Sequence, residues 1–227
     1  LTSTEREAWS RLLRDSATSR WAFLSPTYAG AVHECVGAVE VLLCWHGDEL
    51  AGVMPVQRAR GWLGRMGLRE PAGRQMSDYF GLVAGPGVQL EWPALLKAAG
   101  IPCLYFTHLD ESQAAHGLGG QGPRIGLRTR IHPDGGAAHW ECLRTQDKKL
   151  VSDTERRERK LIAEHGALAF EMQTATPQQD LEQLIALKNA QYQRTGHDGG
   201  ALLDPANARL LQRLLLSTDA DCLPSLS

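Results

Sequence analysis

Two apolar runs joined by a polar turn, within residues 39–56, limit most strongly what this chain can fold into. The runs are VEVLLCW at 39–45 and LAGVMPV at 50–56, and the turn between them is HGDE. Apolar and β-branched runs of this length around a glycine-containing turn predict a β-hairpin. Pro55 has no backbone N–H, so we expect it at a sheet edge or a β-bulge.

Helical signals lie on both sides of this hairpin. Thr4 and Glu7 fit a capping box ahead of an apolar helical pattern, and Ser25-Pro26 fits an N-cap followed by proline at the first helical position. Further helices are predicted at 93–99, 111–117, 146–165, 176–194 and from 204 onward, and further strands at 102–107, 124–132 and 168–172. This mixture predicts an α/β (α+β) fold in which a mixed sheet is flanked by helices.

The order of the predicted elements suggests a domain organisation. The last part of the chain reads as strand, helix, helix and strand, which resembles the beginning of the plan that precedes it. Two short strands and two helices are too little for a complete domain. We therefore expect a first domain at 1–145 and a second, partial unit of the same plan at 146–227. Either the sequence is a fragment, or its C-terminal half packs against the first domain.

Composition excludes several classes of protein. The chain has 24 Lys+Arg and 26 Asp+Glu, a net charge of −2, which gives no reason to expect nucleic-acid or anionic-membrane binding from bulk charge. No apolar run approaches the ~18 residues of a membrane span. The five cysteines are far apart, and the histidines form no H-E-x-x-H pattern, so we expect free thiols, no metal site and a cytoplasmic location. Cys44 and Cys103 fall in apolar runs and are expected to be buried.

Several short motifs, in their order along the chain, resemble one family. WAFLSP at 21–26, GDELAGVMPV at 47–56 and SDY at 77–79 are followed by KKL at 148–150, RRERKL at 156–161 and LIALK at 184–188. This order resembles the CelD/BioF2-like branch of the GNAT acyltransferases, which is related to the tandem-domain FemAB-type proteins. The resemblance covers most of the chain. One departure is that the donor signature Gln/Arg-x-x-Gly-x-Gly/Ala is absent, and its nearest counterpart, RARGWL at 58–63, ends in leucine.

The resemblance implies a fold, an activity and substrates. The fold would be GNAT-like, and the activity would be transfer of an acyl group from acetyl-CoA or another acyl-CoA to an amine or hydroxyl. Members of this branch are associated with cellulose or exopolysaccharide production, so the acceptor would be a sugar or a cell-envelope precursor. Two alternatives remain open: a non-catalytic GNAT-like binding module in a polysaccharide synthesis assembly, and a FemAB-type transferase that uses aminoacyl-tRNA. The net charge argues mildly against the tRNA reading, so no nucleic-acid partner is expected.

Asp78 and Tyr79 are the candidate catalytic residues. Acyl transfer from a thioester requires that the attacking group lose a proton and that the leaving thiolate can gain one. A carboxylate could act as the base, and a phenol could act as the acid. The alternative is that Asp78 caps a turn and Tyr79 packs at the edge of the sheet.

The candidate substrate-binding residues lie on the basic helix and in a later loop. Lys149, Arg156, Arg159 and Lys160 share one helical face that could hold phosphates. The alternative is a solvated helix stabilised by ion pairs, since Asp153–Arg157 and Glu155–Arg159 have i,i+4 spacing. The glycine-rich loop holds a further pair, an imidazole and a carboxylate that could contact the acceptor or could simply be solvated: His197 and Asp198.

Overall fold

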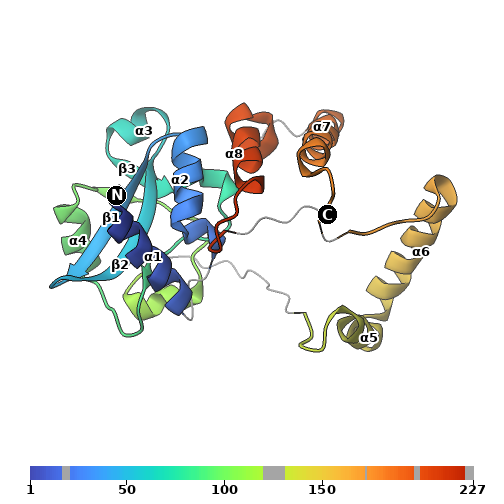
Figure 1. Ribbon diagram of the computed structural model, residues 1–227, viewed down its shortest axis with the longest axis horizontal. Helices are drawn as coiled ribbons and strands as arrows, with labels where there is room; N and C mark the ends of the chain where they lie inside the picture. Colours follow the sequence, from blue (N-terminus) through green and yellow to red (C-terminus); the bar gives the residue numbers. More distant parts are fainter. Residues whose placement is uncertain (17–20, 120–130, 172, 197–199, 223–227) are drawn as a thin grey trace. The chain divides into compact units, whose positions relative to one another are not determined.

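The computed structural model describes residues 1–16, 21–119, 131–171, 173–196 and 200–222. The chain divides into two compact units (Figure 1). The first consists of Leu1–Gln121 together with Met172–Ser227, and the second consists of Gly122–Glu171. The expected boundary between residues 145 and 146 lies inside the second unit, and the hypothesis of a repeated plan stays a prediction.

Helices make up most of the described secondary structure. The α-helices are α1 (Ser3–Asp15), α2 (Pro26–Cys35), α3 (Gly61–Arg65), α4 (Trp92–Ala98), α5 (Gly136–Gln146), α6 (Lys148–His165), α7 (Pro177–Thr195) and α8 (Pro205–Leu215). Short 3-10 helices are η1 (Ala22–Leu24), η2 (Arg74–Met76), η3 (Glu111–His116) and η4 (Ala201–Leu203). Among the described residues, none of the helices combines the length and the hydrophobicity that a membrane span requires.

One mixed sheet forms the centre of the first unit. Its strands are β1 (Val39–His46), β2 (Glu49–Arg58), β3 (Leu68–Pro71), β4 (Val83–Ala84) and β5 (Cys103–Leu104). The order is β1-β2-β3-β5, and β4 also pairs with β2. All pairs are antiparallel except β3 with β5. The predicted hairpin is confirmed, and the sheet with its flanking helices confirms the α/β (α+β) fold class.

The position of Pro55 corrects the expectation of an edge or bulge. Pro55 lies opposite Val41 in the inner strand β2, and the bulge of the hairpin is at Cys44 and Trp45 instead. On the other side of β2, residues 56–58 pair with β3 and residues 52–53 pair with β4. Pro55 therefore falls where that side of the ladder is interrupted, which is why an inner strand tolerates it.

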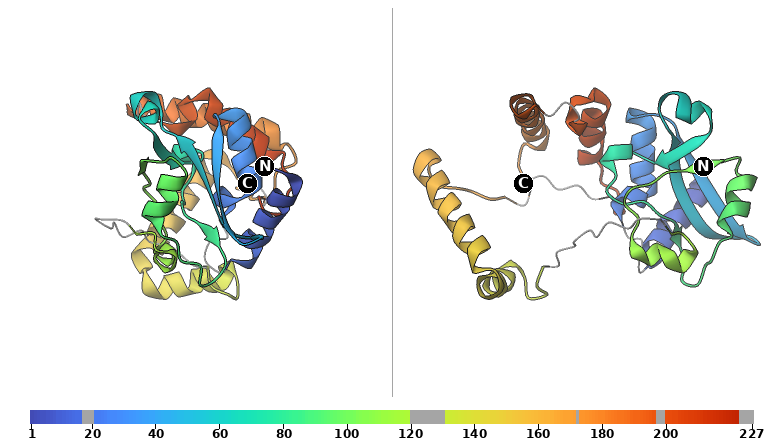
Figure 2. Two further views of the ribbon diagram at one scale, coloured as in Figure 1. Left: turned by 90° about the vertical axis from the view of Figure 1, so that its left-hand side faces the viewer. Right: turned by 180° about the vertical axis from the view of Figure 1, so that it is seen from behind.

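The two faces of the hairpin are covered by different elements. Trp9 and Leu13 of α1 pack with Val53 on one face, and Trp92 of α4 packs with Met54 on the other, because successive side chains of a strand point to opposite sides. A third cluster joins α2 to α8 through Val32 and Leu210. The helices α1 and α2 are seen beside β1 and β2 in Figures 1 and 2. The segment after residue 200 thus packs on α2 and forms part of the first unit.

Helix starts are predicted with mixed success. Ser25 caps α2 and Asp204 caps α8, as predicted. The capping box of α1, however, is made by Thr2 and Glu5, not by Thr4 and Glu7. The T-x-x-E pattern occurs in both registers, so spacing alone cannot choose between them.

Several element predictions are wrong. The predicted strand at 102–107 is a two-residue strand in which Cys103 is exposed, and residues 166–171 form no strand. The helices α3 and α5 form where no helix is predicted. The predicted strand at 124–132 falls mainly outside the described residues, as does the C-terminal strand. These errors arise where runs are short, because periodicity then cannot separate helix from strand.

The side chain of Gln113 makes two hydrogen bonds to the backbone of Leu82, as a neighbouring strand would. Its Oε1 accepts a hydrogen bond from the Leu82 N–H at 2.7 Å, and its Nε2 donates to the Leu82 carbonyl at 3.2 Å. Replacing Gln113 by Ala is expected to lower the free energy of unfolding by about 2 kcal/mol, because both buried bonds are lost. Urea denaturation measures this, with the exposed Gln178→Ala as the control. Equal stability of the two variants would contradict it.

Candidate functional site

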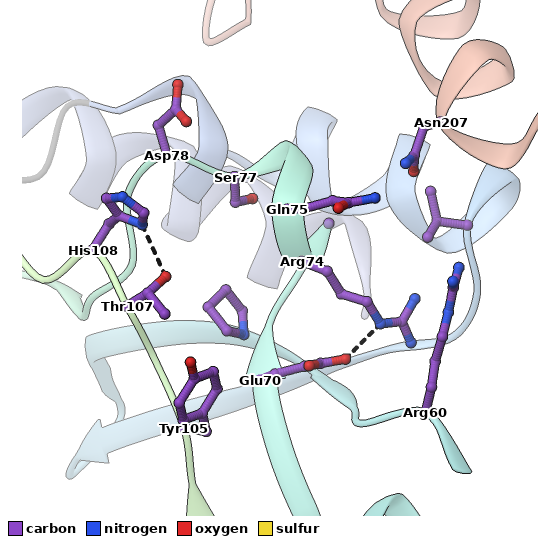
Figure 3. A pocket seen from close by; sticks show the side chains of 13 residues that line it. Arg60, Glu70, Arg74, Gln75, Ser77, Asp78, Tyr105, Thr107, His108 and Asn207 are labelled. Atoms are coloured by element: carbon purple, nitrogen blue, oxygen red, sulfur yellow. Dashed lines mark hydrogen bonds and ion pairs between the residues drawn. The ribbon is translucent and has the colours of Figure 1, made fainter. Parts of the chain in front are cut away.

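A pocket of about 490 Å³ lies between the end of β3, the loop that follows it and the segment after β5. Figure 3 shows its charged and polar walls. The pocket belongs wholly to the first unit. Its lining residues are Val36, Arg60, Glu70, Pro71, Gly73, Arg74, Gln75, Ser77, Asp78, Tyr105, Thr107, His108 and Asn207.

The loop at 71–78 is fixed from beneath by two buried side chains. The Tyr28 hydroxyl donates to the Met76 carbonyl at 2.8 Å, and the Ser77 Oγ lies 3.1 Å from the same hydroxyl oxygen. The Gly73 N–H donates to Gln57 Oε1 at 2.9 Å, and Gln57 Nε2 donates to the Gly37 carbonyl at 2.8 Å. Such bonds from the core hold a loop in one conformation, so the pocket wall is preformed.

Tyr28 gives this loop a testable dependence on pH. Burial raises the pKa of Tyr28 to about 12, against 10.0 for the free side chain. The folded protein therefore keeps a proton that the unfolded chain loses, so this contribution to stability is complete below pH 10 and is lost as the pH rises to about 12. Between these two pH values, the free energy of unfolding of wild type is expected to fall by roughly 2 kcal/mol more than that of Tyr28→Phe. Urea denaturation across this pH range measures the difference, and identical losses would contradict it.

One wall of the pocket contains a strained arginine. Arg74 has φ of +52°, in the left-handed region that is uncommon for residues other than glycine. Its Nε donates to Glu70 Oε1 at 2.5 Å, and its Nη2 donates to the Arg58 carbonyl at 3.1 Å. Strain of this kind is retained where surrounding contacts enforce it, which occurs often at functional sites.

A second arginine joins the pocket to α8. Arg60 Nη2 lies 2.8 Å from Asp204 Oδ2, and this hydrogen bond is the main reason that the pKa of Asp204 is lowered. The other Asp204 oxygen caps α8 by accepting the Ala206 N–H. The cap of α8 is therefore tied to the pocket rim, and Asn207 from the first turn of that helix lines the pocket.

Asp78 and His108 lie at one end of the pocket (Figure 3). A parallel bridge pairs Phe80 with Leu109, and the Phe80 N–H donates to the His108 carbonyl at 2.8 Å. This bridge brings the two chain segments side by side. The Nδ1 of His108 is 2.8 Å from the Thr107 hydroxyl. A carboxylate and an imidazole on adjoining segments are suited to accept a proton from a bound nucleophile.

The structure separates the two predicted catalytic residues. Asp78 lines the pocket and is exposed. Tyr79 is not among the lining residues: its ring stacks on Trp21, with ring centroids 3.9 Å apart, and also contacts Phe23. Tyr79 thus packs against aromatic neighbours, and its catalytic role stays a prediction.

The predicted phosphate-binding residues belong to the second unit. Lys149, Arg156, Arg159 and Lys160 are all exposed on α6. Lys149 lines a hollow of about 280 Å³ with Asp147, Leu150, Asp153, Thr154 and Arg157. His197 and Asp198 lie outside the described residues.

The ion pairs of α6 differ from those that spacing predicts. Asp153 pairs with Arg156 at 3.3 Å rather than with Arg157, and Glu155 pairs with Arg144 of α5 at 3.2 Å rather than with Arg159. The i,i+4 rule considers one helix alone, whereas α5 offers Glu155 a partner from a neighbouring helix. Asp153 and Glu155 nevertheless neutralise part of the positive charge on and around the helix.

Few features of the sequence point to the other pocket residues. His108 follows the short strand β5, and a polar residue at the end of a strand is the only signal that marks it. Arg60, Arg74 and Asn207 come from three separate parts of the chain, and nothing in the sequence brings them together. The described residues include no group of three or more His, Cys, Asp or Glu side chains placed to bind a metal.

Comparison with known proteins adds one finding. Residues 148–223 match the family model of the acetyltransferase (GNAT) domain, and we call these residues the GNAT segment. The GNAT segment therefore supports acyl transfer as the general chemistry, and acyl-CoA as the usual co-substrate of such domains. No curated protein and no solved structure shows a significant match to the chain.

The GNAT segment spans both units. It includes α6 of the second unit and α7 and α8 of the first, while the sheet at 39–104 precedes it. The sheet with its flanking helices is consistent with a GNAT-like arrangement. Because α8 supplies Asn207 and the partner of Arg60, the GNAT segment contributes directly to the pocket.

Proposed function

We propose that this protein transfers an acyl group from acyl-CoA to an amine or hydroxyl acceptor held in the pocket of the first unit. The observation that carries the proposal is the placement of Asp78 and His108 at one end of a preformed pocket to which the GNAT segment contributes. The acceptor nitrogen or oxygen would form a bond to the thioester carbonyl carbon, lose its proton to Asp78 or His108, and displace CoA as its thiolate.

The acceptor in this proposal is a sugar or a cell-envelope precursor, as in the CelD/BioF2-like branch. The pocket supports this choice because Glu70, Arg74, Gln75 and Asn207 present planar polar groups that can bind hydroxyls in pairs. The ring of Tyr105, which lines the same pocket, offers an apolar surface beside them.

The donor in this proposal is acetyl-CoA or another acyl-CoA, a cytoplasmic metabolite. CoA carries phosphates, and the exposed cations of α6 are the residues with the right charge to bind them: Lys149, Arg156, Arg159 and Lys160. Their separation along the helix permits more than one phosphate contact. His197 and Asp198 keep the acceptor-side role that the sequence suggests.

The experiment incubates the chain with acetyl-CoA and a panel of amino sugars and sugars, and measures free CoA and acylated product by chromatography and mass spectrometry. Acceptor-dependent release of CoA supports the proposal. A sugar could instead raise the melting temperature while CoA does not and no product forms. That result would favour a non-catalytic binding module, which is also what the absence of the donor signature favours. RNA binding with a steep salt dependence would favour the aminoacyl-tRNA reading.

A further inference from the structure

The helix α3 and its C-cap residue, Met66, expose three large apolar side chains on one face. Trp62 is 65% exposed, Leu63 is 42% exposed and Met66 is 68% exposed. Positions i, i+1 and i+4 of a helical turn lie within about 100° of one another, so these side chains form one surface. We call Trp62, Leu63, Met66 and Arg65 the α3 tip. The helix α3 is labelled in Figure 1.

Two glycines allow close backbone contacts at α3. Gly64 is buried, and a Cβ at that position would overlap the Ala59 carbonyl, so only glycine fits on the inner side of α3. Gly67 has φ of +96°, and a Cβ there would be 2.6 Å from Pro102. Gly64 thus lets the helix turn closely over Ala59, and Gly67, just after the helix, lets the chain pass close to Pro102. The large apolar side chains lie on the exposed side.

The charges around the α3 tip are mainly positive. The stretch from 58 to 69 contains four arginines and no acidic residue. Glu40 pairs with Arg58 and Arg69, and Asp204 pairs with Arg60. Two more positive than negative charges remain in this group, and in the described part of the chain no carboxylate pairs with Arg65. The overall charge of −2 conceals this local excess.

We propose that the α3 tip docks on an anionic lipid bilayer. Tryptophan favours the membrane interface, exposed apolar side chains enter the boundary between headgroups and acyl chains, and arginines attract acidic headgroups. The size of the surface favours a bilayer over a protein partner. Three side chains provide roughly 500 Å² at most, whereas a stable protein interface buries about 800 Å² on each partner.

The test is co-sedimentation of the whole chain with vesicles of phosphatidylcholine containing about 30% phosphatidylserine. Wild type is expected to bind these vesicles and to bind pure phosphatidylcholine at least about tenfold more weakly. Trp62→Ser combined with Met66→Ser is expected to lower the partition coefficient at least about tenfold. The matched control is Trp45→Ser, which removes a 49% exposed tryptophan from the hairpin and should bind as wild type does.

Two further measurements separate the contribution of the positive charge from that of the inserted tryptophan. Arg65→Glu is expected to weaken binding to the anionic vesicles about tenfold, while Arg11→Glu, an exposed arginine on α1, changes it little. Brominated phosphatidylcholine mixed into the vesicles should quench tryptophan fluorescence in wild type, and this quenching should be lost in Trp62→Phe, which retains an apolar ring and still binds.

Three outcomes would overturn the proposal. Wild type could fail to bind the anionic vesicles, or the α3 tip variants could bind as tightly as Trp45→Ser. Light scattering could also show a dimer that the tip variants abolish, which would make the surface an interface between two copies. None of these results depends on acyl transfer, so the proposal stands or falls apart from the proposed activity.

Discussion

Replacing Asp78 by Asn is expected to slow acyl transfer at least about 100-fold, because the variant keeps the shape of the side chain but cannot accept the acceptor's proton. The melting temperature should stay within about 1 °C of wild type, since the carboxylate is exposed and substitutions at such positions have small effects. Chromatographic CoA release and a thermal scan measure the two quantities.

The matched control for this variant is Asp48→Asn, which changes an exposed carboxylate in the turn of the hairpin. It should leave both quantities unchanged. His108→Gln distinguishes the two candidate bases: if the histidine is the base, this variant loses activity at least about 100-fold and Asp78→Asn loses much less. A large loss of stability in Asp78→Asn, with activity per folded molecule retained, would make Asp78 structural.

Replacing Gly73 by Ala is expected to lower the free energy of unfolding by about 3 kcal/mol and to reduce pocket binding. Gly73 has φ of +83°, and its added methyl group would overlap the Tyr28 hydroxyl. Left-handed backbone costs an alanine about 1 kcal/mol, and the overlap forces movement of a buried ring that also holds Met76. Urea denaturation measures the stability.

Gly30→Ala is the control for this effect. Gly30 lies in α2 with nothing within 4 Å of its added Cβ, so the substitution should stabilise the protein by up to about 1 kcal/mol. If Gly73→Ala is as stable as Gly30→Ala, the loop at 71–78 is not held as rigidly as its hydrogen bonds indicate.

The sequence predicts elements best where a long pattern meets a specific cap. The hairpin at 39–58 has seven-residue runs on both sides of its turn, and α2 and α8 each begin with a capping residue followed by proline. The short strands β4 and β5 have no such signal. They exist because β2 and β3 offer them free edges, which is a property of the assembled sheet.

The site is less predictable than the fold for the same reason. Asp78 stands out in the sequence because it lies in SDY at 77–79, one of the motifs on which the resemblance to the CelD/BioF2-like branch rests. His108 becomes a candidate site residue only because the bridge between Phe80 and Leu109 places it beside Asp78, and Arg74 only because of its backbone conformation. Long-range pairing creates these features, and no local spacing encodes it.

The contribution of α8 to the first unit has a consequence for folding during synthesis. The hairpin joins residues close in sequence and can form as soon as it leaves the ribosome. The pocket cannot be complete then, because Asn207 and the partner of Arg60 are made more than 100 residues later. Meanwhile the surface of α2 that Leu210 covers stays uncovered, so a ribosome stalled before residue 205 should present a nascent chain with a formed sheet, an open pocket and an exposed apolar surface that chaperones bind.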